Sequence, residues 1–225
     1  MGDALVVSRN QNAFLAAALL AALFTAAGAL NTSKAEEQAL PGLKSILGKL
    51  QKGGFVIYFR HAATERSARP DHETDLAKCA SQRNLTAIGR EQALQIGKAI
   101  RALKIPIAMV TVSPFCRTKD TAQLAFGRFT VDNDLHFAIE AGENEQQRLI
   151  ASLRRMLSSP PPPATNAVIV AHSANLREAT RIWPNPEGVA FVFLPLSDGR
   201  YEAVARILPE EWANVALQYP ASNAR

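Results

Sequence analysis

The sequence predicts an α/β fold, a three-layer α/β/α sandwich with a mainly parallel central sheet. From about residue 40 onward, short apolar segments bounded by Gly, Pro or Ser alternate with longer amphipathic segments. This alternation is typical of buried parallel strands connected by helices. Hydrophobic residues make up 48% of the chain and charged residues 20%, which favours a folded domain over a disordered chain.

Five segments are predicted to be strands. Their sequences are FVIYF, IAMVTVS, NAVIVAH, VAFVFL and YEAVARIL, at residues 55–59, 107–113, 166–172, 189–194 and 201–208. The first three are nearly continuous apolar runs, as expected for strands that are covered on both faces. The sheet should therefore have helices on each side.

Four helices are predicted between these strands. In the segment 85–105, Thr86 is a candidate N-cap, and one apolar stripe should contain Ile88, Leu94, Ile96, Ile100 and Leu103. Further helices are expected after Arg117, through 144–157 and from near Asn175. The proline-rich segment 158–166 is predicted to be a loop, because proline lacks the backbone donor that a helix or central strand needs.

Residues 1–35 are predicted to be a signal peptide or an N-terminal membrane anchor. Arg9 precedes residues 13–30, which carry no charge and are rich in Ala and Leu. Small residues permit cleavage after Ala29 or Ala35, but the apolar run is also about long enough to span a bilayer if it is retained. In both cases we expect residues 36–225 to form a domain outside the cytoplasm. The protein would be periplasmic or secreted, or membrane-anchored if the signal is uncleaved.

The charge and the cysteines narrow the choice of partners and compartment. A net charge of +5 favours anionic partners such as phosphates or an acidic membrane surface. Without a long basic block or alternation of basic and aromatic residues, nucleic acid is not expected as a partner.

Cys79 and Cys116 could form one disulfide in an oxidising compartment or remain two buried thiols. Association with a membrane surface and the oligomeric state are left open.

Three of the predicted strands are followed by cationic or titratable side chains. Arg60 and His61 follow the first strand, Arg117 lies just beyond the second, and His172 ends the third. Ligands of open α/β sheets bind beyond the carboxyl ends of the strands, so these four side chains should converge there. Because such groups repel one another unless an anion lies among them, the sequence predicts a pocket for a dianion such as a phosphate monoester.

The same residues predict phosphoryl-transfer chemistry. We expect His61 to be the nucleophile, because histidine can attack phosphorus and form a covalent intermediate. Arg60, Arg117 and a protonated His172 would hold the phosphoryl oxygens and stabilise charge in the transition state. The sequence has no HExxH, CxxC or EF-hand pattern, so we expect neither a metal nor another cofactor.

The segments RHAATE, LTAIGREQA, SPFCRTKDTA and VAHSANLR resemble the successive motifs of the histidine phosphatase superfamily, which includes the cofactor-dependent phosphoglycerate mutases. The resemblance extends over roughly residues 50–207. It implies a phosphoglycerate mutase-like fold with a phosphate pocket made by Arg60, His61, Arg117 and His172. It also implies that His61 becomes phosphorylated.

The sequence departs from the family pattern near these motifs. Ala62 replaces a glycine, so a positive φ there would be strained, and Ala63 replaces a common Glu or Gln. Glu140 is the expected general acid for an alkyl leaving group. Glu143 and Glu65 are alternatives, as is a site without a dedicated acid that acts on an easy leaving group.

Together these features predict an exported phosphomonoesterase with a small phosphorylated substrate. The main alternative is a non-catalytic protein of the same fold that binds a phosphorylated ligand in the same pocket. A phosphoglycerate mutase is a third reading, but it would need cytosolic metabolites and fits poorly with an export signal.

Overall fold

The computed structural model describes residues 40–65, 75–137 and 142–219. The predicted signal segment and Glu140 therefore lie outside the described residues, and the predicted division at residue 35 stays a prediction. Within the described ranges, no helix has both the length and the apolar character needed to cross a bilayer.

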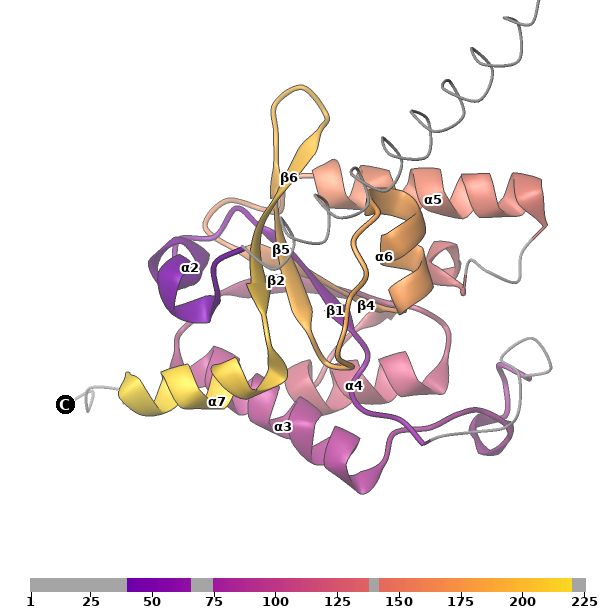
Figure 1. The fold of residues 1–225 in the computed structure, drawn as a ribbon, viewed down its shortest axis with the longest axis horizontal. Helices are drawn as coiled ribbons and strands as arrows, with labels where there is room; N and C mark the ends of the chain where they lie inside the picture. The colour runs from indigo at the N-terminus through magenta and orange to yellow at the C-terminus, as the bar shows by residue number, and fades with distance from the viewer. Residues whose placement is uncertain (1–39, 66–74, 138–141, 220–225) are drawn as a thin grey trace, which may run out of the picture. The chain divides into compact units, whose positions relative to one another are not determined.

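The described residues form a six-stranded sheet in the order β3-β2-β4-β1-β5-β6 (Figure 1). In the described sheet, β5 runs in the opposite direction to the other five strands. All five predicted strands are present, and β3 is an additional strand of two residues. The strands are β1 (Val56–Arg60), β2 (Ile107–Val112), β3 (Thr130–Val131), β4 (Asn166–Ala171), β5 (Ala190–Pro195) and β6 (Tyr201–Ile207).

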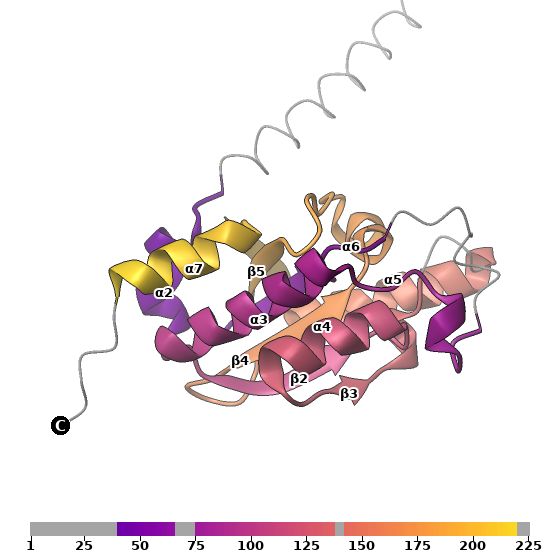
Figure 2. The ribbon, with the colours of Figure 1, turned by 90° about the horizontal axis from the view of Figure 1, so that it is seen from below.

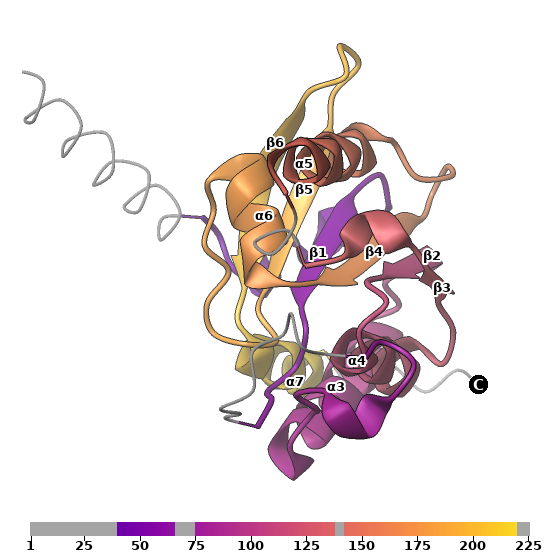
Figure 3. The same ribbon diagram turned by 90° about the vertical axis from the view of Figure 1, so that its right-hand side faces the viewer.

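Helices cover both faces of this sheet, which confirms the predicted three-layer architecture (Figure 3). On one face lie α5 (Glu143–Ser158) and α6 (Ser173–Thr180). The other face carries α2 (Leu43–Leu50), α3 (Ala87–Ala102), α4 (Cys116–Phe126) and α7 (Pro209–Gln218). In Figure 2, α3 and α4 lie in front of the sheet. The helices α2 and α7 were not predicted from the sequence.

The continuous apolar sequence of β1 follows from this layering. Ile57 and Phe59 pack into the core with α2, α3 and α7, whereas Val56 and Tyr58 pack into the core with α5 and α6. Successive side chains of a strand point to opposite faces, so a strand between two helical layers needs apolar residues at every position. All four side chains are at most 1% exposed.

The helix α3 begins as predicted and buries most of the predicted stripe, since Ile96, Ile100 and Leu103 are at most 3% exposed. The Thr86 hydroxyl caps the helix by accepting a hydrogen bond from Gly89 N at 2.9 Å. The prediction that Ile88 is buried was wrong, because 76% of this residue is exposed. The buried face also contains small residues: a Cβ on Gly97 would lie 2.1 Å from Ala125 O. The close approach of α3 to α4 therefore excludes large side chains there.

Asn166, at the start of β4, joins three segments at the end of the sheet away from the predicted pocket. Its Oδ1 accepts a hydrogen bond from Phe55 N at 3.2 Å, and its Nδ2 donates to Leu50 O at 2.8 Å and to Pro106 O at 3.0 Å. The residue is fully buried. It therefore satisfies backbone groups that water cannot reach.

Replacing Asn166 with Ala should lower the free energy of unfolding by about 2–4 kcal/mol, because buried backbone groups lose their partners. Urea denaturation would measure this as a lower midpoint with an unchanged slope. Lys44→Ala, on the exposed face of α2, is the matched control and should change stability by less than about 0.5 kcal/mol. Equal midpoints for the two variants would show that Asn166 does not have this role.

Candidate active site

The pairing of β1, β4 and β2 places the predicted site at one edge of the sheet. These three strands are neighbours and parallel, so their carboxyl ends lie together. The ladder continues one residue past each strand: His61 N donates to Ala171 O at 3.0 Å, and Ser113 N donates to Val170 O at 3.1 Å. The backbone of the site is therefore held by the sheet itself.

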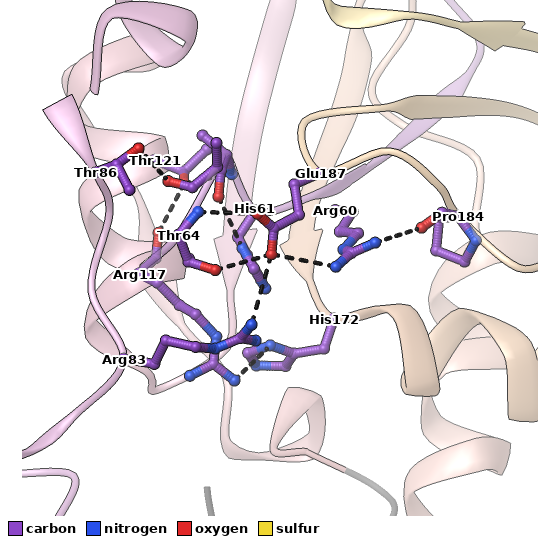
Figure 4. Close-up of polar contacts among 12 residues, drawn as sticks. Arg60, His61, Thr64, Arg83, Thr86, Arg117, Thr121, His172, Pro184 and Glu187 are labelled. Carbon is purple, nitrogen blue, oxygen red and sulfur yellow. Dashed lines mark hydrogen bonds and ion pairs between the residues drawn. The ribbon is translucent and has the colours of Figure 1, made fainter. Parts of the chain in front are cut away.

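Three of the four predicted pocket residues form one buried cluster (Figure 4). The ring centroids of His61 and His172 are 5.6 Å apart. Arg117 Nη2 donates to His172 Nδ1 at 3.2 Å. His61 and His172 are each 1% exposed, and Arg117 is fully buried. The structure thus brings together residues that are up to 111 positions apart in the chain (61 to 172).

His61 is held in one tautomer. Its Nδ1 lies 2.9 Å from Ala62 O, and because a carbonyl can only accept, Nδ1 must carry the proton. The lone pair is then on Nε2. Burial, followed by the positive charge of Arg117, lowers the pKa of His61 well below its ordinary value. The ring is therefore neutral at neutral pH, as a nucleophile must be.

His172 is also neutral in this arrangement. Arg117 donates to its Nδ1, so the proton is on Nε2, which donates to Ser113 Oγ at 2.8 Å. Burial, then the charge of Arg117, lowers the pKa of His172 well below its ordinary value. The protonated His172 expected for transition-state stabilisation therefore requires a bound anion, which would favour the imidazolium form.

Arg60 is engaged differently from the other pocket residues. Its Nη1 donates to Pro184 O at 3.1 Å, and its Nη2 pairs with Glu187 Oε1 at 3.2 Å. Its charge also contributes to the lowered pKa of His61, after burial and Arg117. Arg60 is thus at the site, held by the loop between α6 and β5.

Arg83 and Glu187 were missed by the sequence reasoning. Figure 4 shows Arg83 beside Arg117 and His172, and its positive charge adds to the lowered pKa values of His61 and His172. Glu187 Oε1 lies 3.6 Å from Arg83 Nη1. The position of Arg83 two residues before the predicted LTAIGREQA motif was a usable signal. Glu187 follows no motif, and only the fold identifies it.

Ala62 and Ala63 are accommodated without strain. Ala62 is not among the described residues with positive φ, so the expected strain of replacing glycine does not arise. Its N donates to Thr121 Oγ1 at 3.1 Å, while Ala63 N donates to Gln92 Oε1 at 3.0 Å. Both departures from the family pattern are therefore compatible with an ordered site.

The structure does not identify a general acid. Glu140 lies outside the described residues. Glu65 and Glu143, the alternatives, are exposed, and Glu143 is the first residue of α5. The assignment of Glu140 therefore stays a prediction. Within the described ranges, no group of three or more His, Cys, Asp or Glu side chains could hold a metal ion.

The three-layer fold and the cluster at its edge define a phosphoglycerate mutase-like domain. The model of the histidine phosphatase superfamily (branch 1) matches residues 56–138, which contain Arg60, His61 and Arg117. This part of the chain is therefore similar to the histidine phosphatase superfamily, which confirms the resemblance seen in the motifs. A comparison with curated protein sequences gave no match.

The chain is similar to several solved structures at low sequence identity. The protein histidine phosphatase SixA complexed with tungstate is 16% identical, with a TM-score of 0.50, covering 70% of this chain and 98% of SixA. An Agrobacterium tumefaciens protein described as a phosphohistidine phosphatase SixA is 16% identical (TM-score 0.46, covering 69% and 99%). An Escherichia coli protein described as an α-ribazole-5′-P phosphatase is 14% identical (TM-score 0.48, covering 70% and 98%).

A disulfide joins the segment before Arg83 to the start of α4, which carries Arg117. Cys79 and Cys116 are bonded, with their Cα atoms 5.6 Å apart. Cys116 directly precedes Arg117, and Cys79 lies in a short 3₁₀ helix shortly before Arg83. Gln82 Oε1 also accepts a hydrogen bond from Cys116 N at 2.8 Å. The bond therefore fixes the distance between two cationic segments.

Replacing both cysteines with serine should lower the free energy of unfolding by about 3–4 kcal/mol, because the bond closes a long loop. The affinity for inorganic phosphate should also fall, since the segment with Arg83 is no longer tied to α4. Urea denaturation and calorimetric titration with phosphate would measure the two effects. A variant with unchanged stability and unchanged phosphate affinity would contradict this role of the disulfide.

The two buried histidines predict how stability depends on pH. In the unfolded chain they take up protons near a pKa of 6.5, but in the folded protein both pKa values are much lower. The free energy of unfolding should therefore decrease as the pH falls below 6.5 toward the folded pKa values, by up to about 1.4 kcal/mol per pH unit and histidine.

Urea denaturation at a series of pH values would measure this slope. A double variant, His61→Gln with His172→Gln, should show a shallower dependence over the same range. The same slope in both proteins would mean that other groups control the acid sensitivity.

Proposed function

We propose that the protein is an exported phosphomonoesterase that hydrolyses its substrate through a phosphohistidine on His61. The observation that carries this proposal is the buried cluster of His61, His172 and Arg117 at the ends of three adjacent strands. In it, a neutral imidazole has its Nε2 lone pair available next to a guanidinium group. This is the combination that phosphoryl transfer to histidine requires.

In the first step, His61 Nε2 attacks phosphorus, and the bond from phosphorus to the leaving oxygen breaks. The leaving oxygen takes a proton, for which Glu140 is the proposed donor, unless the leaving group needs none. Arg117 and Arg60 stabilise the charge on the transferring group. The N–H groups of Arg117 that contact His172 in this structure would turn to phosphoryl oxygens, and His172 would take up a proton at Nδ1.

In the second step, water attacks the phosphohistidine and breaks the bond between phosphorus and nitrogen. Inorganic phosphate leaves, and Nε2 regains its lone pair. The hydrogen bond from Nδ1–H to Ala62 O keeps the ring in the same tautomer and orientation for the next cycle. The charges that act in both steps are side chains, so we propose that the reaction needs no metal ion.

Two further observations support the proposal. The SixA structure of the same fold contains tungstate, which, like phosphate, is a tetrahedral oxyanion. The disulfide between Cys79 and Cys116 is compatible with the oxidising compartment that the N-terminal segment predicts. Export itself remains a proposal that rests on the sequence of residues 1–35.

His61→Ala should lower kcat on an activated aryl phosphate by at least about 10³-fold, because no nucleophile remains. EDTA should leave the wild-type rate unchanged. After a rapid quench, mass spectrometry should find an acid-labile phosphate on the peptide that contains His61 in the wild type.

The controls separate the alternatives. Thermal unfolding of His61→Ala should show that the fold is retained. Tight binding of phosphate by the wild type, without turnover of any ester in a diverse panel, would instead identify a binding protein. Interconversion of phosphoglycerates without net release of phosphate would identify a mutase.

A further inference from the structure

We propose that Glu187 is a positioning residue, which holds Arg60 and Arg83 in the orientation that the phosphoryl group requires. This inference builds on the proposed function, because it assigns a role to a residue beside the nucleophile. Glu187 lies in the loop between α6 and β5, outside every motif noted in the sequence.

The carboxylate of Glu187 connects three segments of the site (Figure 4). Its Oε1 pairs with Arg60 Nη2 at 3.2 Å, lies 3.6 Å from Arg83 Nη1, and accepts a hydrogen bond from Thr64 Oγ1 at 2.8 Å. Its Oε2 accepts a hydrogen bond from Thr64 N at 2.9 Å. One side chain therefore ties the end of β1, the loop after it and the segment before α3.

Hydrogen bonds connect the backbone around Glu187 to the nucleophile His61 and to Gln92. The next residue, Gly188, donates from its N to His61 O at 2.9 Å, and Gln92 Nε2 donates to Glu187 O at 3.3 Å. Gly188 has a φ of +83°, and a Cβ there would lie 2.5 Å from the Gln92 side chain. This positive φ favours glycine, and the hydrogen bond from Gly188 N to His61 O holds Glu187 close to the nucleophile.

The charges around the site explain why a carboxylate is needed. Arg60, Arg83 and Arg117 surround two buried histidines, and among the described residues Glu187 is the acidic side chain in contact with two of these arginines. The side chains of Arg60 and Glu187 are only 15% and 20% exposed, so solvent screens their attraction weakly. Without it, the guanidinium groups would repel one another and sample many rotamers.

Removing the charge should affect catalysis more than substrate binding. A dianion loses affinity when the arginines become mobile, but it gains affinity when a neighbouring carboxylate no longer repels it. These two effects oppose each other in the ground state. The transition state depends more strongly on aligned donors, so there the loss outweighs the gain.

The test is Glu187→Gln, whose amide oxygen can still accept the hydrogen bonds of Thr64. For an activated aryl phosphate, kcat should fall about tenfold while KM changes less than about threefold. The matched control is Glu178→Gln, which breaks an ion pair with Arg177 on α6 and should leave both constants unchanged. Glu187→Asp, which keeps the charge, should recover part of the lost kcat.

A double-mutant cycle shows whether Glu187 acts through Arg60. In the background of Arg60→Ala, Glu187→Gln should lower kcat less than about threefold, because one of the two arginines that it positions is gone. Full additivity of the two effects would overturn the inference. So would a wild-type kcat in Glu187→Gln.

A spectroscopic measurement separates this inference from the proposed function. In ¹⁵N spectra of the guanidinium groups, Arg60 and Arg83 should give resolved, slowly rotating signals in the wild type but averaged signals in Glu187→Gln. This readout needs no turnover. If the wild type hydrolyses no ester, the proposed function fails while the spectra still test Glu187. Unchanged spectra in the variant would overturn the positioning role in either case.

Discussion

The parallel pairing of β1 with β4, and of β4 with β2, is the constraint on which the site depends. It brings His61, His172 and Arg117 to one edge of the sheet, and the ladder extends past β1 through His61 N and Ala171 O. Clustered cationic groups oppose this arrangement, but the apolar cores on both sides of the strands stabilise it. Packing of the sheet therefore holds together groups that would otherwise separate.

Two features of the site reduce the repulsion between its positive charges. Two histidines are kept neutral by burial and by neighbouring arginines, so fewer positive charges must be accommodated. Two arginines share the carboxylate of Glu187. Both devices leave donors and a lone pair arranged for an incoming dianion, which would supply the balancing negative charge. The stability of the fold and its proposed chemistry thus depend on the same residues.

Much of the fold could be predicted because buried strands and helices have characteristic patterns of apolar residues in the sequence. All five long strands were found, since a strand between two helical layers must be apolar throughout, as β1 is. Short β3 leaves no such pattern, and α2 and α7 escaped notice near the ends of the domain. Ile88 was predicted to be buried but is exposed. Helical periodicity identifies the apolar face of a helix, but it does not show which part of that face a neighbouring helix covers.

The sequence by itself determined which residues gather at the site. Arg60 ends β1, His61 and His172 directly follow β1 and β4, and Arg117 lies beyond β2. Parallel strands end at a common edge, so these side chains meet there. It also contained the Cys79–Cys116 pair without showing whether the two would bond. Only the tertiary structure decided which protons the histidines carry and that Glu187 and Arg83 join the site. The physical reason is that tautomers and ion pairs depend on distances of a few ångströms between segments far apart in the chain, and no local pattern records those distances.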